Sequence, residues 1–412
     1  MNVYTFLILS FVVAVYSIET IADLLNIKNL SNNIPLEFEE YYDREKYIKS
    51  QKYLKTTTKF SIVSSTFFLA IQIIFIISGG FNYLNTTVVS FGFGPILTGL
   101  TFVGIFFFAS EILKVPFSIY SVFVIEKKFG FNRTNTKTFF TDLLKSWIVT
   151  AIIDSVIFIA ILWFFISVRQ YAWLYAFLVI VIFELFITFI SPVIIMPLFN
   201  KYTPLENGEL KNSIEKYAKK ENFKMKGLLK MDGSKRSTKS NAFFTGIGKF
   251  RRIVLFDTLI QKHSVDELTS ILAHEMGHFK LGHILKHMIF SFVLTLTMLF
   301  VFSFFIDKIW FYDAFLMDTQ PIYAGIIFFS FLYEPVSLIT SIVLSYFSRK
   351  HEYEADAYAA KTYKKPEAMI NALKKLSVDN LSNLYPHKFK VFLEYSHPPV
   401  LERIKAINKI EL

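Results

Sequence analysis

The sequence predicts an all-α multispan membrane protein, with about seven transmembrane helices and a smaller α+β unit outside the bilayer. Of the 412 residues, 53% are hydrophobic, and the mean hydropathy of +0.43 is too high for an ordinary soluble protein of this length. A helix crosses the hydrocarbon core of a bilayer with about 20 apolar residues. Seven stretches approach that length, near residues 2–20, 60–79, 96–120, 147–168, 172–197, 287–306 and 320–346.

Lysine and arginine indicate which loops face the cytoplasm. Residues 20–59 hold seven of them and residues 115–146 hold five, whereas residues 80–95 hold none. Because basic residues collect in cytoplasmic loops, we expect the N-terminus outside and the polar segments 198–286 and 347–412 in the cytoplasm. The same rule accounts for the net charge of +11, so this charge does not indicate a nucleic-acid partner.

Four parts are predicted along the chain. Residues 1–197 hold five spans, 198–286 a polar α+β segment, 287–346 two spans, and 347–412 a second polar segment. The first span has no basic residue before it and no small-residue cleavage site after it, so we expect a retained anchor. The two polar segments are expected to form one unit, because neither alone looks large enough to bury a good core. The chain has no cysteine, which excludes disulfides and thiolate metal ligands.

The polar segments contain short predicted elements. Residues 209–224 have apolar side chains at helical spacing. Runs bounded by Gly and Asp then predict three strands of a small sheet: "GLLKMDG", "KSNAFFTG" and "RRIVLFDTLI". Ser264 and Glu267 form a capping box that begins the next helix. In the second segment, "RKHEYEADAYAAKTY" predicts a helix, and "SHPPVLERIKAI" predicts a turn followed by a last helix.

A metal-binding pattern lies on the helix that follows the capping box. In "AHEMGH", His274 and His278 are four residues apart and therefore share one helix face. Neutral imidazoles suit Zn²⁺, and a catalytic zinc takes three protein ligands and one water. Glu275 is the expected general base of a metalloprotease with this motif. The alternative is a set of solvated polar residues on an amphipathic helix.

A third ligand is available in "HEYEAD". Glu352 and Asp356 are four residues apart and share a helix face. One of these carboxylates can bind the metal while the other accepts the free N–H of a histidine ligand. A charged helix face without a metal is the alternative for this stretch.

These motifs together resemble the CaaX prenyl protease 1 family, which are integral membrane zinc metalloproteases of the gluzincin type. The order is "HEMGH", then "SRKHEYEADAYA", then "YSHPPVLERI". The segments at 126–134, 197–211 and 232–246 are similar to the family as well, so the resemblance covers nearly the whole chain. It implies a ring of seven helices around a large water-filled chamber, with the zinc site at the cytoplasmic end.

The resemblance also implies a ligand set. One zinc ion per chain would be bound by His274, His278 and Glu352, with Glu275 as the base. Glu352, and not Glu354, occupies the glutamate position of the family pattern "E-[FY]-x-A-D". Zinc in such a site acidifies its water and polarises the substrate carbonyl.

Four further residues match family positions. The resemblance implies that Asp356 orients a histidine ligand and that Arg403 is an ion-pair partner near the site. It implies that Asn241 and His397 contact the substrate backbone or stabilise the oxyanion. The residues themselves support part of this, since an edge strand at "SNAFFTG" can bind an extended peptide and a histidine N–H can stabilise a developing oxyanion. The alternatives are a polar residue at a strand edge for Asn241 and a turn residue for His397.

The remaining histidines are not expected to bind metal. His283 and His287 form another i, i+4 pair on what the sequence predicts to be the same helix. Nine residues after His274, His283 would lie about 180° round that helix and face away from the site. His351, like His263 and His387, shows no pattern.

Several other polar residues lie in or near the predicted spans. Asp154, Glu184 and Glu334 lie inside these spans, where acids normally face a cavity or a bundle interior. We weigh chamber lining and salt-bridged packing equally for them. Asn85-Thr86-Thr87 is a glycosylation pattern on the predicted outer side.

The predicted function is that of a zinc-dependent membrane endopeptidase, monomeric, with its site on the cytoplasmic side of a bacterial inner membrane or the endoplasmic reticulum. The resemblance implies a protein or peptide substrate with a prenylated C-terminus, from which the last three residues are removed. Two alternatives remain at this stage. One is a protease for membrane-protein quality control, and the other is a non-enzymatic membrane scaffold or transporter.

Overall fold

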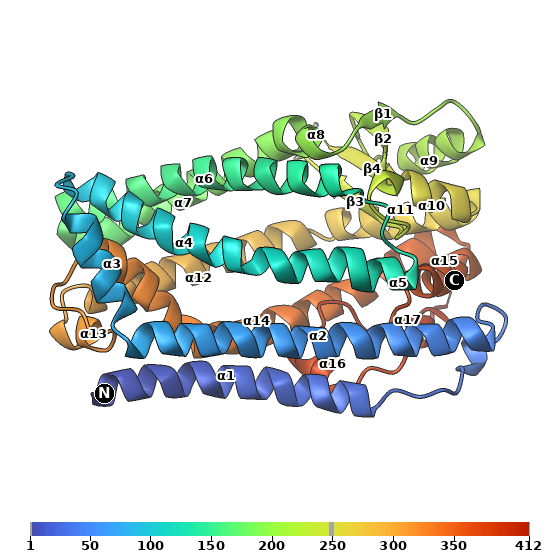
Figure 1. Cartoon of the computed structure of the whole chain (residues 1–412). Helices are drawn as coiled ribbons and strands as arrows, with labels where there is room; N and C mark the ends of the chain where they lie inside the picture. Colours follow the sequence, from blue (N-terminus) through green and yellow to red (C-terminus); the bar gives the residue numbers. More distant parts are fainter. Residues whose placement is uncertain (1, 247–250, 412) are drawn as a thin grey trace.

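The computed structural model describes residues 2–246 and 251–411, and in this part seven helices are long and apolar enough to cross a membrane (Figure 1). The seven predicted spans fall on these seven helices, so the predicted fold class is confirmed. The spanning helices are α1 (Val3–Lys28), α2 (Arg44–Ile77), α4 (Pro95–Tyr120) with η2 (Ser121–Glu126) and α5 (Lys127–Phe129), α6 (Thr136–Ser167), α7 (Ala172–Ile190) with η4 (Ser191–Ile195) and α8 (Met196–Phe199), α12 (His283–Phe305) and α14 (Ile322–Tyr363).

The end of the bundle away from the sheet is closed by aromatic side chains. The short helices α3 (Gly80–Val89) and α13 (Ile309–Asp313) lie at this end (Figure 1). Phe328 stacks on Phe315 with ring centroids 4.0 Å apart, and Phe81 meets Phe328 edge-on at 5.0 Å. Aromatic packing of this kind buries much apolar area per residue and so ties the spans together.

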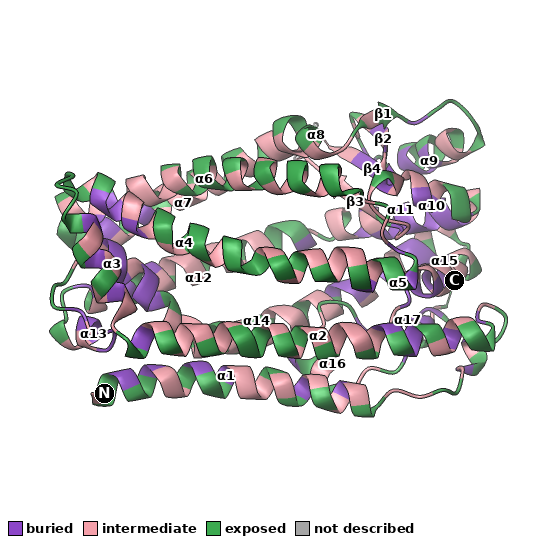
Figure 2. Cartoon of the chain, in the orientation of Figure 1, coloured by how far each residue is buried: buried purple, intermediate pink, exposed green. Residues whose placement is uncertain are grey.

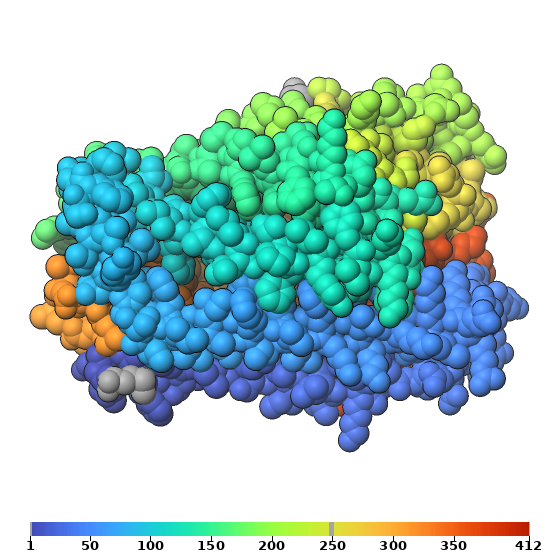
Figure 3. All heavy atoms as spheres, in the orientation of Figure 1, coloured from blue at the N-terminus to red at the C-terminus, as the bar shows by residue number. Residues whose placement is uncertain are grey.

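The middle of the bundle is hollow. Buried residues gather towards its two ends, while the mid-sections of most spans are half-buried or exposed (Figure 2). A cavity of about 640 Å³ lies between α1, α2, α4 and α14, and the charged residues Glu19, Lys114 and Glu334 are among those that line it. In space-filling view, α2, α4 and α6 form much of the outer wall (Figure 3). Glu334 thus lines a cavity, one of the two arrangements weighed for it.

The α+β unit contains a four-stranded sheet in the order β1-β2-β4-β3. Strand β2 runs parallel to β4, and the other two pairs are antiparallel. Each of the three predicted runs contains a strand, but the third was predicted too long, because its last residues, "DTLI", begin helix α10 (Asp257–Lys262). Strand β3 lies at an edge of the sheet. The fourth strand, β1, was not predicted, because three residues ending in proline give no strand signal. The strands are β1 (Tyr202–Pro204), β2 (Gly227–Met231), β3 (Ala242–Thr245) and β4 (Arg252–Phe256).

The two polar segments share one hydrophobic core, as expected from their size. Leu272 and Met276 from α11 pack in the same cluster as Leu228 of β2, and the cluster includes Ala359 of α14 and Ala372 of α15. At this end of the molecule the sheet and the short helices lie together (Figure 1). The helices of the unit are α9 (Glu209–Lys220), α10 (Asp257–Lys262), α11 (Val265–Lys280), α15 (Pro366–Asp379), α16 (Lys388–Glu394) and α17 (Val400–Ile407).

Helix α14 links the membrane to this unit without a break. Its 42 residues span about 63 Å at about 1.5 Å per residue, roughly twice the hydrocarbon thickness of about 30 Å. The helix continues without interruption through residues 346 and 347, where the sequence predicted a boundary between two parts of the chain. Because Glu352 and Asp356 lie near the end of α14, the same continuous helix that crosses the membrane sets their positions.

The glycosylation pattern at Asn85 is not available in this fold. Asn85 is only 4% exposed. Its amide nitrogen donates to Thr319 Oγ1 at 3.1 Å, and its Oδ1 accepts from the Tyr323 hydroxyl at 2.6 Å. Burial leaves no room for a glycan on this nitrogen, and the two contacts give the asparagine a structural role.

Helices α11 and α14 approach closely at Gly277. A Cβ atom at this position would lie 3.1 Å from the Ala355 Cα and 3.2 Å from the Tyr358 Cβ. The first of these is backbone, which cannot swing aside as a flexible side chain could. A glycine at position 277 therefore lets the two helices pack at this distance.

We expect Gly277→Ala to lower the melting temperature, because overpacking costs about 1–3 kcal/mol against a helix-propensity gain of at most about 1 kcal/mol. The control is Gly104→Ala in α4, where an added Cβ meets nothing within 4 Å. Thermal unfolding of both variants in the same detergent measures the difference. Equal stability of the two variants would show that the α11–α14 approach is not tight.

Candidate metal centre

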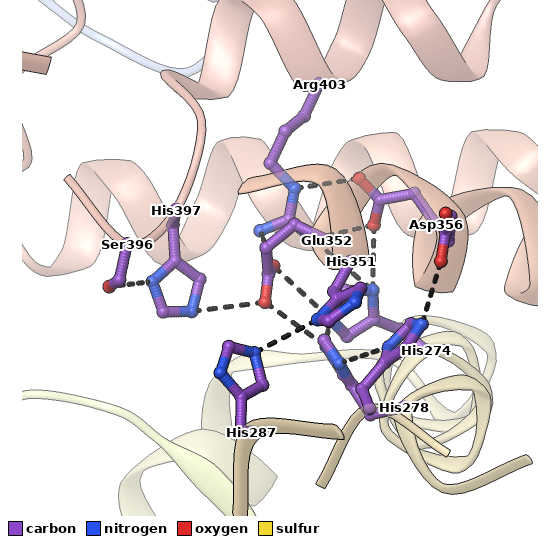
Figure 4. A network of polar contacts seen from close by, with 11 residues as sticks. His274, His278, His287, His351, Glu352, Asp356, Ser396, His397 and Arg403 are labelled. Atoms are coloured by element: carbon purple, nitrogen blue, oxygen red, sulfur yellow. Dashed lines mark hydrogen bonds and ion pairs between the residues drawn. The ribbon is translucent and has the colours of Figure 1, made fainter. Parts of the chain in front are cut away.

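The helix that carries the histidine motif begins as the sequence predicted. Glu267 N donates to Ser264 Oγ at 3.3 Å, and Ser264 N donates to Glu267 Oε2 at 3.0 Å, which completes the capping box. These bonds satisfy two of the free N–H groups at the helix start. The helix that follows carries His274, Glu275 and His278, with His274 and His278 on the face towards α14 (Figure 4).

Three predicted ligands converge on one point. His274 Nε2 lies 3.1 Å from His278 Nε2, His278 Nε2 lies 3.1 Å from Glu352 Oε1, and His274 Nε2 lies 3.5 Å from Glu352 Oε2. A tetrahedral zinc with bonds of about 2.0–2.1 Å separates its ligand atoms by about 3.3 Å. Glu352 Oε2 is buried and forms no well-aligned hydrogen bond among the described residues, although the Arg403 guanidinium lies 3.1 Å from it. The donor set and its spacing therefore fit a small four-coordinate metal ion.

The structure distinguishes the two glutamates of "HEYEAD". Glu352 points towards His274 and His278, whereas Glu354 Oε2 lies 2.9 Å from His283 Nε2. Side chains two residues apart leave a helix on different sides. Glu352 is thus the one brought to the histidine pair.

Asp356 lies behind the first histidine. Its Oδ1 accepts from His274 Nδ1 at 2.8 Å, which leaves Nε2 free to bind a metal. Burial lowers the pKa of His274, but the bonds to Asp356 and Glu352 outweigh it and raise the pKa to about 9. A carboxylate in this position holds the ring in one tautomer and one orientation.

Arg403 from α17 pairs with both acids. Its Nε donates to Asp356 Oδ2 at 2.8 Å and its Nη2 to Asp356 Oδ1 at 2.6 Å. Its Nη1 lies 3.1 Å from Glu352 Oε2. All three side chains are buried, so the guanidinium offsets much of the cost of removing two carboxylates from water. The contact of Asp356 with a histidine and the ion pairs of Arg403, which the family resemblance implied, are thus present.

Glu275 follows the first histidine on α11 and is half-buried. Burial raises its pKa, although the nearby His274 and His278 lower it in part. A carboxylate with a raised pKa holds a transferred proton more readily.

His397 and Asn241 lie at different distances from the ligands. His397 comes from the turn before α17, and its Nε2 lies 3.4 Å from Glu352 Oε1 (Figure 4). Its side chain is 65% exposed, so it can reach a bound molecule. Asn241 stands at the start of edge strand β3, and its Oδ1 accepts from Ala242 N at 2.8 Å. The structure brings His397 to the ligand cluster and leaves Asn241 on the adjoining strand.

The expectation for His283 was wrong. Its Nδ1 lies 3.0 Å from His278 Nδ1 instead of on the far side of the helix. The reason is a break: α11 ends at Lys280, and Gly282 has a φ of +70° before α12 begins at His283. The rotation per residue of a single helix does not apply across this break. A glycine just past the last helical turn is a stop signal that could have predicted it.

The fold and the histidine–carboxylate site together define a membrane-embedded metalloprotease. Residues 23–201 match the protein family described as "CAAX prenyl protease N-terminal, five membrane helices". Residues 204–411 match the family described as "Peptidase family M48". The chain belongs to the CAAX prenyl protease 1 family of M48 peptidases. Membership in this family implies a bound metal ion.

Known relatives cover nearly the whole chain. The CAAX prenyl protease 1 of Saccharomyces cerevisiae is 34% identical over 98% of this chain and 95% of its own. The human CAAX prenyl protease 1 homolog is 32% identical over 93% of this chain and 90% of its own. The crystal structure of S. mikatae Ste24p superposes with a TM-score of 0.94 at 33% identity, covering 99% of this chain and 100% of that one.

We expect Asp356→Asn to weaken metal binding about 10–100-fold, the usual effect of losing a carboxylate behind a ligand histidine. The amide cannot accept two bonds from Arg403 and also hold His274. Competition with a chromophoric chelator measures the affinity. The control is Glu402→Gln, because Glu402 is next to Arg403 in sequence but accepts from the Tyr353 hydroxyl at 3.2 Å. Equal affinity in both variants would remove Asp356 from this role.

Proposed function

We propose that the chain is a zinc-dependent endopeptidase that removes the last three residues of proteins with a prenylated C-terminal cysteine. The observation that carries this proposal is the convergence of His274, His278 and Glu352 at the spacing of a zinc site. Imidazole and carboxylate ligands suit zinc among the metals available to a protease. The names of the relatives supply the substrate class.

Glu275 is the proposed general base. Zinc, when bound, acts as a Lewis acid towards the scissile carbonyl and water. Glu275 takes a proton from the attacking water and then gives it to the leaving amine. Its raised pKa supports both halves of this exchange.

Two further groups are proposed to hold the substrate. In the described part of the chain β3 is an edge strand, which can pair with an extended peptide through main-chain hydrogen bonds, and Asn241 just before it can contact the peptide backbone. His397, exposed beside Glu352, can donate its ring N–H to the oxyanion that develops on the carbonyl.

The interior of the bundle suits a lipid-modified substrate. A second cavity of about 440 Å³ is lined mainly by apolar side chains of α2, α3 and α4, including Phe75, Phe81 and Phe106. It shares Phe68, Gln72 and Lys114 with the 640 Å³ cavity, so the two spaces adjoin. An isoprenoid chain would gain about 0.8 kcal/mol for each CH₂ that it buries there.

The distribution of basic residues supports a cytoplasmic site. The loops that hold many lysines and arginines alternate with loops that hold few, as expected when each span carries the chain to the other side of the membrane. We propose that the α+β unit faces the cytoplasm and that the protein acts as a monomer.

Glu275→Gln is expected to lower kcat for peptide cleavage about 10²–10⁴-fold, the usual contribution of a general base, while zinc content stays at one ion in the centre. Cleavage assays and metal analysis on the same sample measure both. The control is Asp266→Asn, an acid in the first turn of the same helix that pairs with Lys365 at 2.7 Å. Retained cleavage in the Gln variant would show that Glu275 is not the general base.

His397→Ala is expected to lower kcat about 10²–10³-fold with little change in KM, the effect of losing one oxyanion donor. Zinc content should not change, because His397 is not among the three proposed ligands. Ser396→Ala, which removes the hydroxyl 3.0 Å from His397 Nδ1, should give a smaller loss. A rise in KM alone would assign His397 to substrate binding instead.

The substrate class is tested with a farnesylated CaaX peptide and the same peptide without the lipid. We expect a higher kcat/KM for the farnesylated peptide, because the apolar cavity binds the lipid. Equal rates would contradict the proposed preference for a lipid-modified substrate. They would favour a general membrane protease, such as one for membrane-protein quality control. Cleavage of neither peptide by the zinc-loaded protein would contradict the protease itself.

A further inference from the structure

We propose that the protein has a second site for a divalent transition-metal ion, formed by His283, His287, His351 and Glu354. None of these side chains belongs to the proposed catalytic ligand set. The site lies where the first turns of α12 meet α14, beside the catalytic centre.

The spacing of the four residues places them on facing helix surfaces. His283 and His287 are four residues apart at the start of α12, and His351 and Glu354 are three apart on α14. Both spacings put a pair of side chains on one face of a helix. Two such pairs on adjacent helices are a common way to build a metal site between helices.

The contacts between them bring the donor atoms together. His283 Nε2 lies 2.9 Å from Glu354 Oε2, and His351 Nδ1 lies 3.0 Å from His287 Nε2. His283, His351 and Glu354 each offer a ligand atom within 4.8 Å of the other two. Figure 4 shows His287 and His351 joined across the two helices. Three imidazoles and one carboxylate form a complete set for a zinc-type ion. A metal-bound neutral imidazole keeps its proton on the other nitrogen, so His283 Nδ1 must move away from His278 Nδ1 when both sites are filled.

An access route leads to this cluster from outside the catalytic centre. A pocket of about 290 Å³ is lined by His287, His351 and Glu354. Lys286 and Lys350 also line it, and Lys350 Nζ lies 3.9 Å from Glu354 Oε1. The Lys350 side chain is 60% exposed, and an ion pair of this kind is worth about 0–1 kcal/mol. A metal ion therefore displaces this lysine at little cost.

Binding requires one ring to turn. The rings of His283 and His351 are stacked, with centroids 4.0 Å apart and planes at 10°. In that arrangement the nitrogen lone pairs run nearly parallel and do not point at one ion. Because the χ2 torsion of histidine is broad, the His351 ring can rotate towards Glu354 and the adjoining pocket.

The test is metal stoichiometry in the full-length protein in detergent, stripped with chelator and reloaded with micromolar Co²⁺. Visible absorption and elemental analysis count the ions. We expect two per chain in the wild type, one in His274→Ala, and one in the double variant His287→Asn/His351→Phe. Phe preserves the stack on His283, and Asn preserves a polar side chain. The triple variant should bind none, and His387→Asn, which removes a histidine from elsewhere, should bind two.

The outcomes separate the two sites. If the wild type and the double variant each bind one ion, the second site is overturned. An ion that persists in the triple variant would overturn it as well. If His274→Ala does not fold, the comparison of wild type with the double variant decides alone. A wild type that binds one ion, lost in the double variant and kept in His274→Ala, would support the second site and overturn the catalytic centre. His283 is left intact because it contacts His278.

Discussion

The close crossing of α11 and α14 is the contact on which the rest of the structure depends. Two histidines on one helix can bind a metal only weakly without a third ligand, and that ligand lies on another helix far along the chain. Gly277 lets the helices approach until Glu352 reaches both imidazoles. Since α14 is also a membrane span, the same contact fixes the site relative to the bilayer.

Charge balance explains why this contact carries so many buried polar groups. Glu352 and Asp356 bring two negative charges into the interior, and Arg403 supplies one positive charge. A divalent cation at the proposed site would more than offset the one remaining negative charge, so metal binding there would be coupled to folding of this region. Arg403 comes from α17, and the end of the chain therefore helps to hold the two acids in place.

The hollow bundle reflects a division of packing within the membrane part. Aromatic side chains pack at one end and the α+β unit packs at the other, while Glu19, Lys114 and Glu334 line the space between. Ionisable groups in a membrane protein are stable where water or a partner reaches them. A cavity between the spans meets this need.

Local periodicity in the sequence determined the seven spans, the capped helix that begins after Ser264, the three longer strands and the histidine pair, because each depends on residues within a few turns of one another. The resemblance to a family singled out Glu352. Tertiary structure decided what local patterns could not express: the break at Gly282 that turns His283 towards His278, the burial of Asn85, and the unbroken course of α14 through the predicted division. These features depend on which helices touch and at what rotation, and contacts between distant segments leave no periodic signal in a single chain.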